Sequence, residues 1–403
     1  MKFVIITHAV HKLTKQGIFA YEPYVREMNL WLKYVDAVNI VAPISSKKVS
    51  TIESAYAFKK MEAIQLNPIP SFNITSFKNS LKTLFKLPLI CYQIFKAMYW
   101  ADHIHLRCPG NVGLLGCLVQ IVFPTKPKTI KYAGNWDPKS KQPLSYRIQK
   151  WLLSNSFLTR NCKVLVYGEW PNQPKNIVPF FTASYSETEL EEIASKTLLK
   201  NKEIALLHTP RNFGKLDYSI VEEKSDTQKL YLIYVGGLTI GKQPLVSVQV
   251  AEQLMAMGYA VQLDIYGDGE ERTKLENYIA TKQLQQEVIL HGNTAKDMVK
   301  KAYQKAHFLV FISKSEGWPK VVAEAMFWGC VPITSNVSCI PYMLGEGSRG
   351  TIVVPNVNEI CIVIKRYLTT IEMYKMHSKN ALEWSRNFTL EKFEQGIASL
   401  CSQ

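Results

Sequence analysis

The 403-residue chain lacks several patterns that would place it in common classes of protein. Its eight cysteines include no Cys-x-x-Cys pair, so neither a disulfide framework nor a thiolate zinc site is expected. We predict buried thiols in a reducing, cytoplasmic compartment. No apolar run reaches the ~18 residues that a membrane-spanning helix requires. No group of histidines and carboxylates has the spacing of a metal site, so no metal is predicted.

Acidic residues are scarce in the first part of the chain. Residues 1–180 contain 24 Lys and Arg but 8 Asp and Glu, whereas residues 181–403 contain 24 and 25. The net charge of +15 therefore arises in the first half, which favours contact with an anionic membrane or another polyanion. A basic surface that only maintains solubility is the alternative interpretation. Because no nucleic-acid motif accompanies the charge, nucleic acid is not an expected partner.

Short apolar runs alternate with amphipathic segments of helical length, which is typical of β/α units with parallel sheets. The length predicts two domains of about 200 residues each. The polar segment 184–227 is expected to contain the connection between them. We predict strands at 2–7, 37–42, 103–107, 128–133 and 163–167, and then at 230–236, 260–266, 287–291, 307–312, 331–334 and 350–354.

The most informative stretch is SEGWPKVVAEAM, which follows a predicted buried strand. Pro319 suits the first position of a helix and Gly329 suits its C-terminus, so the segment predicts a strand, a tight loop and a helix start. The N–H groups of such a helix start attract phosphate. Glu316 lies on the loop and Glu324 about one to two turns into the helix. Two carboxylates beside an anion site suit a nucleotide-sugar, whose diphosphate lies between two sets of hydroxyls.

These residues also carry a family resemblance. Glu316 and Glu324 form the E-x7-E pattern of retaining GT-B glycosyltransferases, and SEGWPKVVAEAMFWGCVPITSN resembles family 4 of that class, the glycosyl transferases group 1. Segments 234–238, 263–269 and 288–293 resemble further donor-site segments, so that residues 229–355 are covered well. The resemblance implies an α/β protein of the GT-B fold, with two Rossmann-like domains facing across a cleft. We predict an acceptor-binding domain at 1–183, a nucleotide-sugar-binding domain at 184–375, and a C-terminal helix at 376–403 that packs back on the first domain.

The resemblance implies roles for individual side chains. Lys242 would neutralise charge on the leaving diphosphate and Glu316 would contact the transferred sugar, which makes these two the predicted catalytic residues. Glu324 would accept hydrogen bonds from the donor ribose. The alternatives are an exposed loop lysine and a helix glutamate favoured by the dipole. The other implied donor contacts are Gly236, Gly237, Gly267, Asn293, Gly317, Trp318, Lys320 and Val321, and core packing is an alternative role for Trp318.

Gly237 departs from the family pattern, which has an arginine at this position. Lys242 then acts with another basic residue, or backbone N–H groups replace the missing cation, or the activity is weakened. The last possibility leaves open a catalytically silent GT-B scaffold that binds a nucleotide.

The first half offers fewer candidates for an acceptor site. His8 and Gly17 follow the first predicted strand, where the family has a glycine-rich loop. Asn135 and Asp137 lie where many relatives carry a histidine, and they either orient an acceptor hydroxyl or form a polar turn.

Two further patterns in the first half have competing interpretations. The basic and aromatic segment 77–100 suits a helix at a membrane interface, or a domain helix that Pro88 divides into two pieces. His103 and His105 share one face of a strand, and a structural role is favoured for both.

The resemblance implies a retaining hexosyltransferase that uses a UDP- or GDP-sugar as co-substrate, without a further cofactor. Its acceptor would be a hydroxyl of a glycan or lipid-linked molecule, for a surface polysaccharide made at the inner face of the membrane. A silent scaffold and a GT-B sugar-nucleotide epimerase are the alternative functions.

Overall fold

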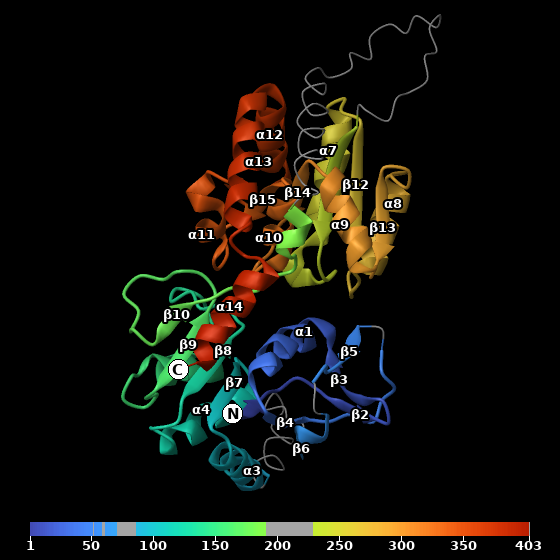
Figure 1. Cartoon of the computed structure of the whole chain (residues 1–403). Coiled ribbons are helices and arrows are strands. Elements are labelled where there is room, and N and C mark those ends of the chain that lie inside the picture. Colours follow the sequence, from blue (N-terminus) through green and yellow to red (C-terminus); the bar gives the residue numbers. More distant parts are fainter. Residues whose placement is uncertain (51, 59–60, 71–85, 191–228, 403) are drawn as a thin grey trace, which may run out of the picture. The chain divides into compact units, whose positions relative to one another are not determined.

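The computed structural model describes residues 1–50, 52–58, 61–70, 86–190 and 229–402. Contacts divide the chain into two units, one made of Met1–Thr182 with Lys392–Gln403 and the other of Ala183–Glu391. Each unit is built on its own parallel sheet (Figure 1). The predicted α/β class with two Rossmann-like domains is therefore confirmed. Most of the predicted connection, residues 191–227, lies outside the described residues.

The first unit contains a seven-stranded parallel sheet in the order β10-β9-β8-β7-β1-β4-β6. The five strands predicted there are all present, with each end within one residue of its expected place. Two edge strands, β6 and β10, were not predicted. The strands are β1 (Lys2–Ile6), β4 (Ala37–Pro43), β6 (Ile64–Ile69), β7 (His103–Cys108), β8 (Lys128–Tyr132), β9 (Cys162–Val166) and β10 (Ile177–Pro179).

Helices cover both faces of this sheet. α3 (Leu87–Trp100), α4 (Asn111–Val119) and α5 (Leu144–Ser154) bury their inner sides in one core, together with Val4 and Ile6 of β1. Phe3 points to the opposite face, because side chains alternate along a strand, and stacks on Trp31 of α1 (Glu22–Trp31) at 5.8 Å. A small antiparallel sheet joins β2 (Lys12–Thr14), β3 (Gly17–Tyr21) and β5 (Glu53–Ala55).

Pro88 lies at the start of a helix. It lies in the first turn of α3, where its missing N–H removes no helical hydrogen bond. Residues 87–100 therefore form one helix that starts beside Pro88, as expected for the second of the two predicted pieces. The preceding part of the predicted segment, residues 77–85, lies outside the described residues.

The second unit contains a six-stranded parallel sheet in the order β13-β12-β11-β14-β15-β16, and all six predicted strands are present. The strands are β11 (Leu230–Val235), β12 (Val261–Tyr266), β13 (Val288–Gly292), β14 (Phe308–Phe311), β15 (Val331–Ser335) and β16 (Thr351–Val353). The helices are α7 (Pro244–Ala256), α8 (Arg272–Thr281), α9 (Lys296–Lys305), α10 (Lys320–Phe327), α11 (Ile340–Leu344), α12 (Val357–Thr369) and α13 (Ile371–Ser385).

The last residues of the chain belong to the first unit. α13 packs on α10 and α12 and belongs to the second unit. Only Lys392–Gln403, most of α14 (Leu390–Cys401), joins the first unit, where the Phe393 ring lies 5.2 Å from Phe180 and 5.6 Å from Phe181. The segment that returns is thus shorter than the predicted 376–403.

Most of the cysteines are the buried thiols that the sequence predicts. All eight cysteines are free thiols, and six of them are buried. Among the described residues, no helix combines the length and the apolar character that crossing a bilayer would require.

Buried imidazoles occupy the α1 face of the first sheet. His103 and His105 both contact the Thr129 hydroxyl at 2.9 Å and stack on Phe3, which supports the structural role expected for them. His11 is also buried and contacts the Tyr56 hydroxyl at 2.8 Å. Burial lowers the pKa of His11 and of His103 to about 4. All three side chains therefore fit the fold as neutral groups.

We expect the first unit to lose stability as the pH falls from about 6.5 toward 4. In this interval the unfolded chain binds protons at His11 and His103 that the folded chain does not, so acid favours unfolding. At pH 5 each histidine should cost about 2 kcal/mol. Urea unfolding at pH 7 and pH 5 measures the decrease, and the conservative variant His103→Gln should reduce it by about 2 kcal/mol. An identical pH dependence in wild type and variant would contradict the assignment.

Candidate functional site

The candidate site lies where the strand order of the second sheet reverses. β11 and β14 are neighbours, yet their chain connections lead to opposite sides of the sheet. In open α/β sheets, ligands bind at the carboxyl ends of the strands at such a point. The loops that follow β11 and β14 contain Gly236–Lys242 and Ser313–Pro319. Both predicted catalytic residues therefore lie at this position.

The loops after β11 and β12 run closer together than side chains would allow. A Cβ on Gly267 would lie 2.0 Å from the Gly236 carbonyl oxygen, and Gly267 also has a positive φ of 127°. A Cβ on Gly269 would lie 2.4 Å from the Leu238 carbonyl oxygen. The Leu238 N–H donates to the Asp268 carbonyl at 3.0 Å, which fixes the two loops side by side. Both positions therefore require glycine, which gives the Gly-rich turn a physical reason.

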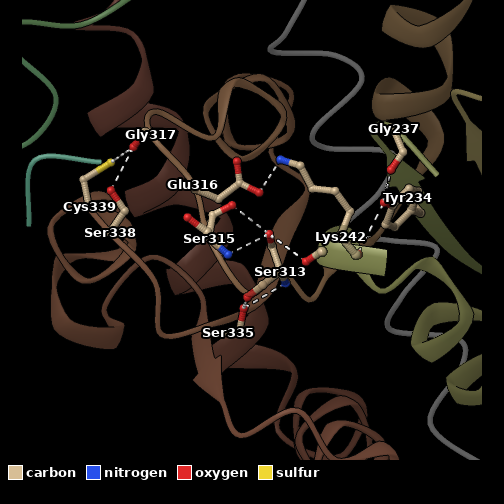
Figure 2. Close-up of polar contacts among 11 residues, drawn as sticks. Tyr234, Gly237, Lys242, Ser313, Ser315, Glu316, Gly317, Ser335, Ser338 and Cys339 are labelled. Carbon is tan, nitrogen blue, oxygen red and sulfur yellow. Dashed lines mark hydrogen bonds and ion pairs between the residues drawn. The ribbon is translucent and has the colours of Figure 1, made fainter. Parts of the chain in front are cut away.

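Lys242 and Glu316 form an ion pair across the two loops (Figure 2). Lys242 ends a short 3-10 helix, η6 (Ile240–Lys242), and its ammonium lies 5.2 Å from the centre of the Phe311 ring. The Glu316 side chain is 7% exposed and the Lys242 side chain 30% exposed. The ammonium is thus held in place at its inner side and open to solvent at its outer side. A fixed, partly solvated cation at a sheet switch point is suited to an anionic ligand.

Serine hydroxyls hold the Glu316 loop against its neighbours, as Figure 2 shows. Ser335 of β15 accepts from the Ser313 N–H at 2.9 Å and donates to the Ser313 carbonyl at 2.6 Å. The Gly241 carbonyl accepts from the Lys314 N–H at 2.8 Å, which ties this loop to η6. Sequence reasoning missed Ser313, Ser335 and Gly241, because the motif alone does not reveal contacts between distant segments. They position Lys242 and Glu316 relative to each other.

The helix start predicted at Pro319 is displaced by one residue. Pro319 is the N-cap of α10 and Lys320 is the first helical residue, so the prediction that Pro319 occupies the first helical position is wrong. The N–H groups of Lys320 and Val321 therefore form the phosphate-attracting end of the helix. Gly329 follows the C-cap with φ of 70°, as predicted for a left-handed helix end.

Glu324 forms hydrogen bonds of its own, separate from the Lys242–Glu316 ion pair. Its carboxylate accepts hydrogen bonds from the Ser184 hydroxyl at 2.5 Å and from the buried Tyr303 hydroxyl at 3.3 Å. Burial and the nearby carboxylate raise the pKa of Tyr303 well above its ordinary value, so this tyrosine remains a donor. The structure thus gives the two predicted carboxylates separate hydrogen-bonding partners.

Trp318 and Gly317 connect the loop to the packed part of the unit. Trp318 is 7% exposed, and its ring centre lies 6.2 Å from that of Trp384 and 5.5 Å from that of Phe388, so core packing accounts for its side chain. The Gly317 carbonyl accepts from the Ser338 hydroxyl at 3.0 Å. A ligand contact of these two residues would therefore use backbone groups.

The remaining donor-site candidates of the second unit surround the same edge of the sheet. Asn293 follows β13 and is exposed. Gly237 has room for a side chain: the atom nearest to an added Cβ would be Thr239 Cγ2 at 3.7 Å. Steric crowding therefore does not explain why this position lacks an arginine.

The weaker candidates belong to the first unit. His8 follows β1 and lies against Gly110, which follows β7; these strands are neighbours where that sheet reverses its order. Gly17, with φ of 131°, begins the second strand of the β2–β3 hairpin. Asn135 accepts the Asp137 N–H at 2.9 Å, and Asp137 accepts the Lys139 N–H at 2.8 Å, which supports the polar-turn interpretation of this pair.

The sequence-based resemblance is confirmed by a family model. Residues 218–384 match the glycosyl transferases group 1, so this part of the chain carries the domain of that family. One curated relative, an uncharacterized glycosyltransferase of Methanocaldococcus jannaschii, is 28% identical over 134 residues. The matched segment is 33% of this chain and 38% of the relative, so the chain spans less than two thirds of that protein.

Solved structures share the fold over the whole chain. HepE of Anabaena, crystallised with UDP and glucose, has a TM-score of 0.64 at 13% identity and full coverage of both chains. Sucrose-phosphate synthase of Thermosynechococcus elongatus has a TM-score of 0.63 at 16% identity, covering 100% of this chain and 98% of its own. WaaG, a glycosyltransferase involved in lipopolysaccharide biosynthesis, has a TM-score of 0.61 at 13% identity and full coverage of both chains. At these identities the likeness establishes the GT-B fold alone.

Proposed function

We propose that this chain is a retaining hexosyltransferase that transfers a sugar from a nucleotide-sugar to an acceptor hydroxyl. The observation that carries the proposal is the Lys242–Glu316 pair at the switch point of a sheet within the family-matched residues. HepE, which shares the fold, binds UDP and UDP-glucose, and this supports a UDP-sugar as the donor. A GDP-sugar remains the second donor class to test.

The geometry of the site suits departure of a nucleoside diphosphate. Cleavage of the sugar–phosphate bond leaves negative charge on the β-phosphate, and a preorganised cation lowers the barrier to that charge. Lys242 supplies the cation, and the first N–H groups of α10 supply further donors at the same edge of the sheet. Glu316, which pairs with Lys242, would contact the transferred sugar. No covalent nucleophile is assigned, and the leaving phosphate would take the acceptor proton on the same face.

The acceptor is proposed as a glycan or lipid-linked hydroxyl at the inner face of a membrane. WaaG, which shares the fold, takes part in lipopolysaccharide biosynthesis, and this supports a surface polysaccharide as the product class. No cofactor beyond the nucleotide-sugar is proposed. His8, Gly17, Asn135 and Asp137 stay candidates for acceptor contacts in the first unit.

A donor screen tests the proposal directly. Isothermal titration of the full chain with UDP-, GDP-, ADP- and dTDP-sugars should reveal binding to one nucleotide class. We expect Glu324→Ala to weaken that binding by about 10- to 100-fold, because two charge-assisted hydrogen bonds to ribose hydroxyls are lost.

The matched control is Glu383→Ala, which removes an exposed carboxylate from α13 and should leave the affinity unchanged. A well-folded chain that binds none of the four classes would contradict the proposal and favour the silent scaffold. Conversion of the donor sugar without any acceptor would favour the epimerase.

A further inference from the structure

The outer side of the α3–α4–α5 layer in the first unit is apolar and basic at the same time. We infer that this layer docks the chain onto the surface of an anionic lipid bilayer. The inference concerns a surface of the first unit, whereas Lys242 and Glu316 belong to the second, so it does not depend on the proposed reaction.

The three helices form one continuous layer. α3 packs on α4, and α4 packs on α5. Their inner residues, among them Ile94, Leu115 and Leu152, share one buried core with the sheet. Because the inner sides all face that core, the opposite sides of the three helices face outward together.

Large apolar side chains cover these outward sides. Tyr92 and Tyr99 of α3 are 62% and 72% exposed, and Leu144 and Trp151 of α5 are 68% and 61% exposed. Phe157, just beyond α5, is 70% exposed. Helices that pack on one core usually present polar residues on the other side, so this arrangement calls for a second apolar environment. Tyrosine and tryptophan are the residues that favour the boundary between lipid and water.

The positive charge of the α3–α4–α5 layer indicates that the surface it binds is anionic. α3, α4 and α5 contain no Asp or Glu, and residues 86–163 contain 12 Lys and Arg against 2 Asp. Exposed cations flank the apolar side chains, namely Lys86 at the N-cap of α3, Lys96 on α3, Arg147 on α5 and Arg160 beside Phe157. Lysine and arginine near an anionic leaflet each add to its attraction, while the apolar side chains enter the headgroup region.

A second copy of the chain fits this surface less well than an anionic bilayer does. A two-fold interface would place the same patch against itself. Cations would then face cations with no carboxylate on any of the three helices to pair with them. Anionic lipid headgroups supply the missing negative charge.

Flotation of the full chain with vesicles, in the absence of nucleotide, tests the inference. We expect at least tenfold stronger partition to phosphatidylcholine vesicles containing one quarter phosphatidylglycerol than to pure phosphatidylcholine, and release at 1 M salt, where the screening length falls to about 3 Å. Trp151→Ser combined with Phe157→Ser should lower the partition by about tenfold or more. Lys86→Glu combined with Lys96→Glu should lower it to a similar degree.

Matched variants in the second unit separate the surface from general effects of composition. Ile362, on α12, is 61% exposed, as is Trp151, so Ile362→Ser combined with Met376→Ser should leave partition unchanged. Lys301→Glu combined with Lys365→Glu gives the same change in net charge and should also have little effect. Equal losses in test and control variants, or no preference for anionic vesicles, would overturn the inference. So would a stable dimer that dissociates in the Trp151 and Phe157 variant.

Donor titration of the same variants keeps this inference separate from the proposed reaction. If the α3–α4–α5 layer docks on the bilayer, its variants should lose vesicle binding and keep the donor affinity of the wild type. Failure of donor binding in the wild type would leave the vesicle result unaffected.

Discussion

Replacing Lys242 by alanine should lower kcat for sugar transfer, or for hydrolysis of the donor, by about 10²–10³-fold. The cation that meets the leaving diphosphate would be lost, and the Gly237 position supplies no second one. Donor binding should weaken less than kcat, because the negative charge on the diphosphate grows as the bond breaks. Initial rates at saturating donor, together with titration of the nucleotide, separate the two effects. A kcat within fivefold of wild type would show that Lys242 does not serve the reaction.

The same substitution has a structural effect that must be separated from catalysis. It leaves the Glu316 carboxylate, 7% exposed, without its cation, which should cost about 1–2 kcal/mol of stability because the lysine end of the pair is open to water. The double variant Lys242→Ala with Glu316→Gln removes the unpaired charge and should recover most of that stability without recovering kcat. Recovery of both would assign Lys242 a purely structural role.

Replacing Gly267 by alanine should have the largest effect on the fold of the site. The new Cβ would lie 2.0 Å from the Gly236 carbonyl oxygen, and the φ of 127° is strained for any side chain. We expect a loss of about 3 kcal/mol or more in the free energy of unfolding, and loss of donor binding, because the β11 and β12 loops must separate. Urea unfolding and donor titration measure the two.

Gly241→Ala is the matched control for this prediction. Gly241 lies in the same group of loops, but no atom lies within 4 Å of its potential Cβ. Its stability and donor affinity should stay close to those of the wild type. If both variants behave alike, then close approach of the two loops is not what makes Gly267 necessary.

The sequence predicted the parallel sheets well because buried parallel strands leave a strong local signal. Apolar runs located strands such as β1 (KFVII) and β14 (FLVF), and every end of a predicted strand lies within one residue of the observed end. β6 was not predicted because Gln65, Asn67 and Pro68 interrupt its apolar pattern, and β10 was not predicted because it has three residues and ends in a proline. The small β2–β3–β5 sheet was not predicted because its strands mix apolar and polar residues. In addition, β5 pairs with β3, which lies in a distant part of the chain.

In the candidate site, only the residues that belong to sequence motifs could be predicted. Lys242 and Glu316 were singled out together, and the structure pairs them. The hydrogen bonds of Ser313 and Ser335 could not be predicted, because they depend on the packing of β14 beside β15. The partners of Glu324, Ser184 and Tyr303, likewise come from segments far apart in the chain. The spacing of apolar residues predicts where helices and strands lie, whereas the contacts between their loops depend on tertiary packing.

The open space at Gly237 has a consequence for how this chain could evolve. A single nucleotide change converts a glycine codon into an arginine codon, and the backbone here would accept the longer side chain without rearrangement at its Cβ. The arginine that is usual in the family is therefore one mutational step away. Neither the genetic code nor the space around this Cβ would prevent its return.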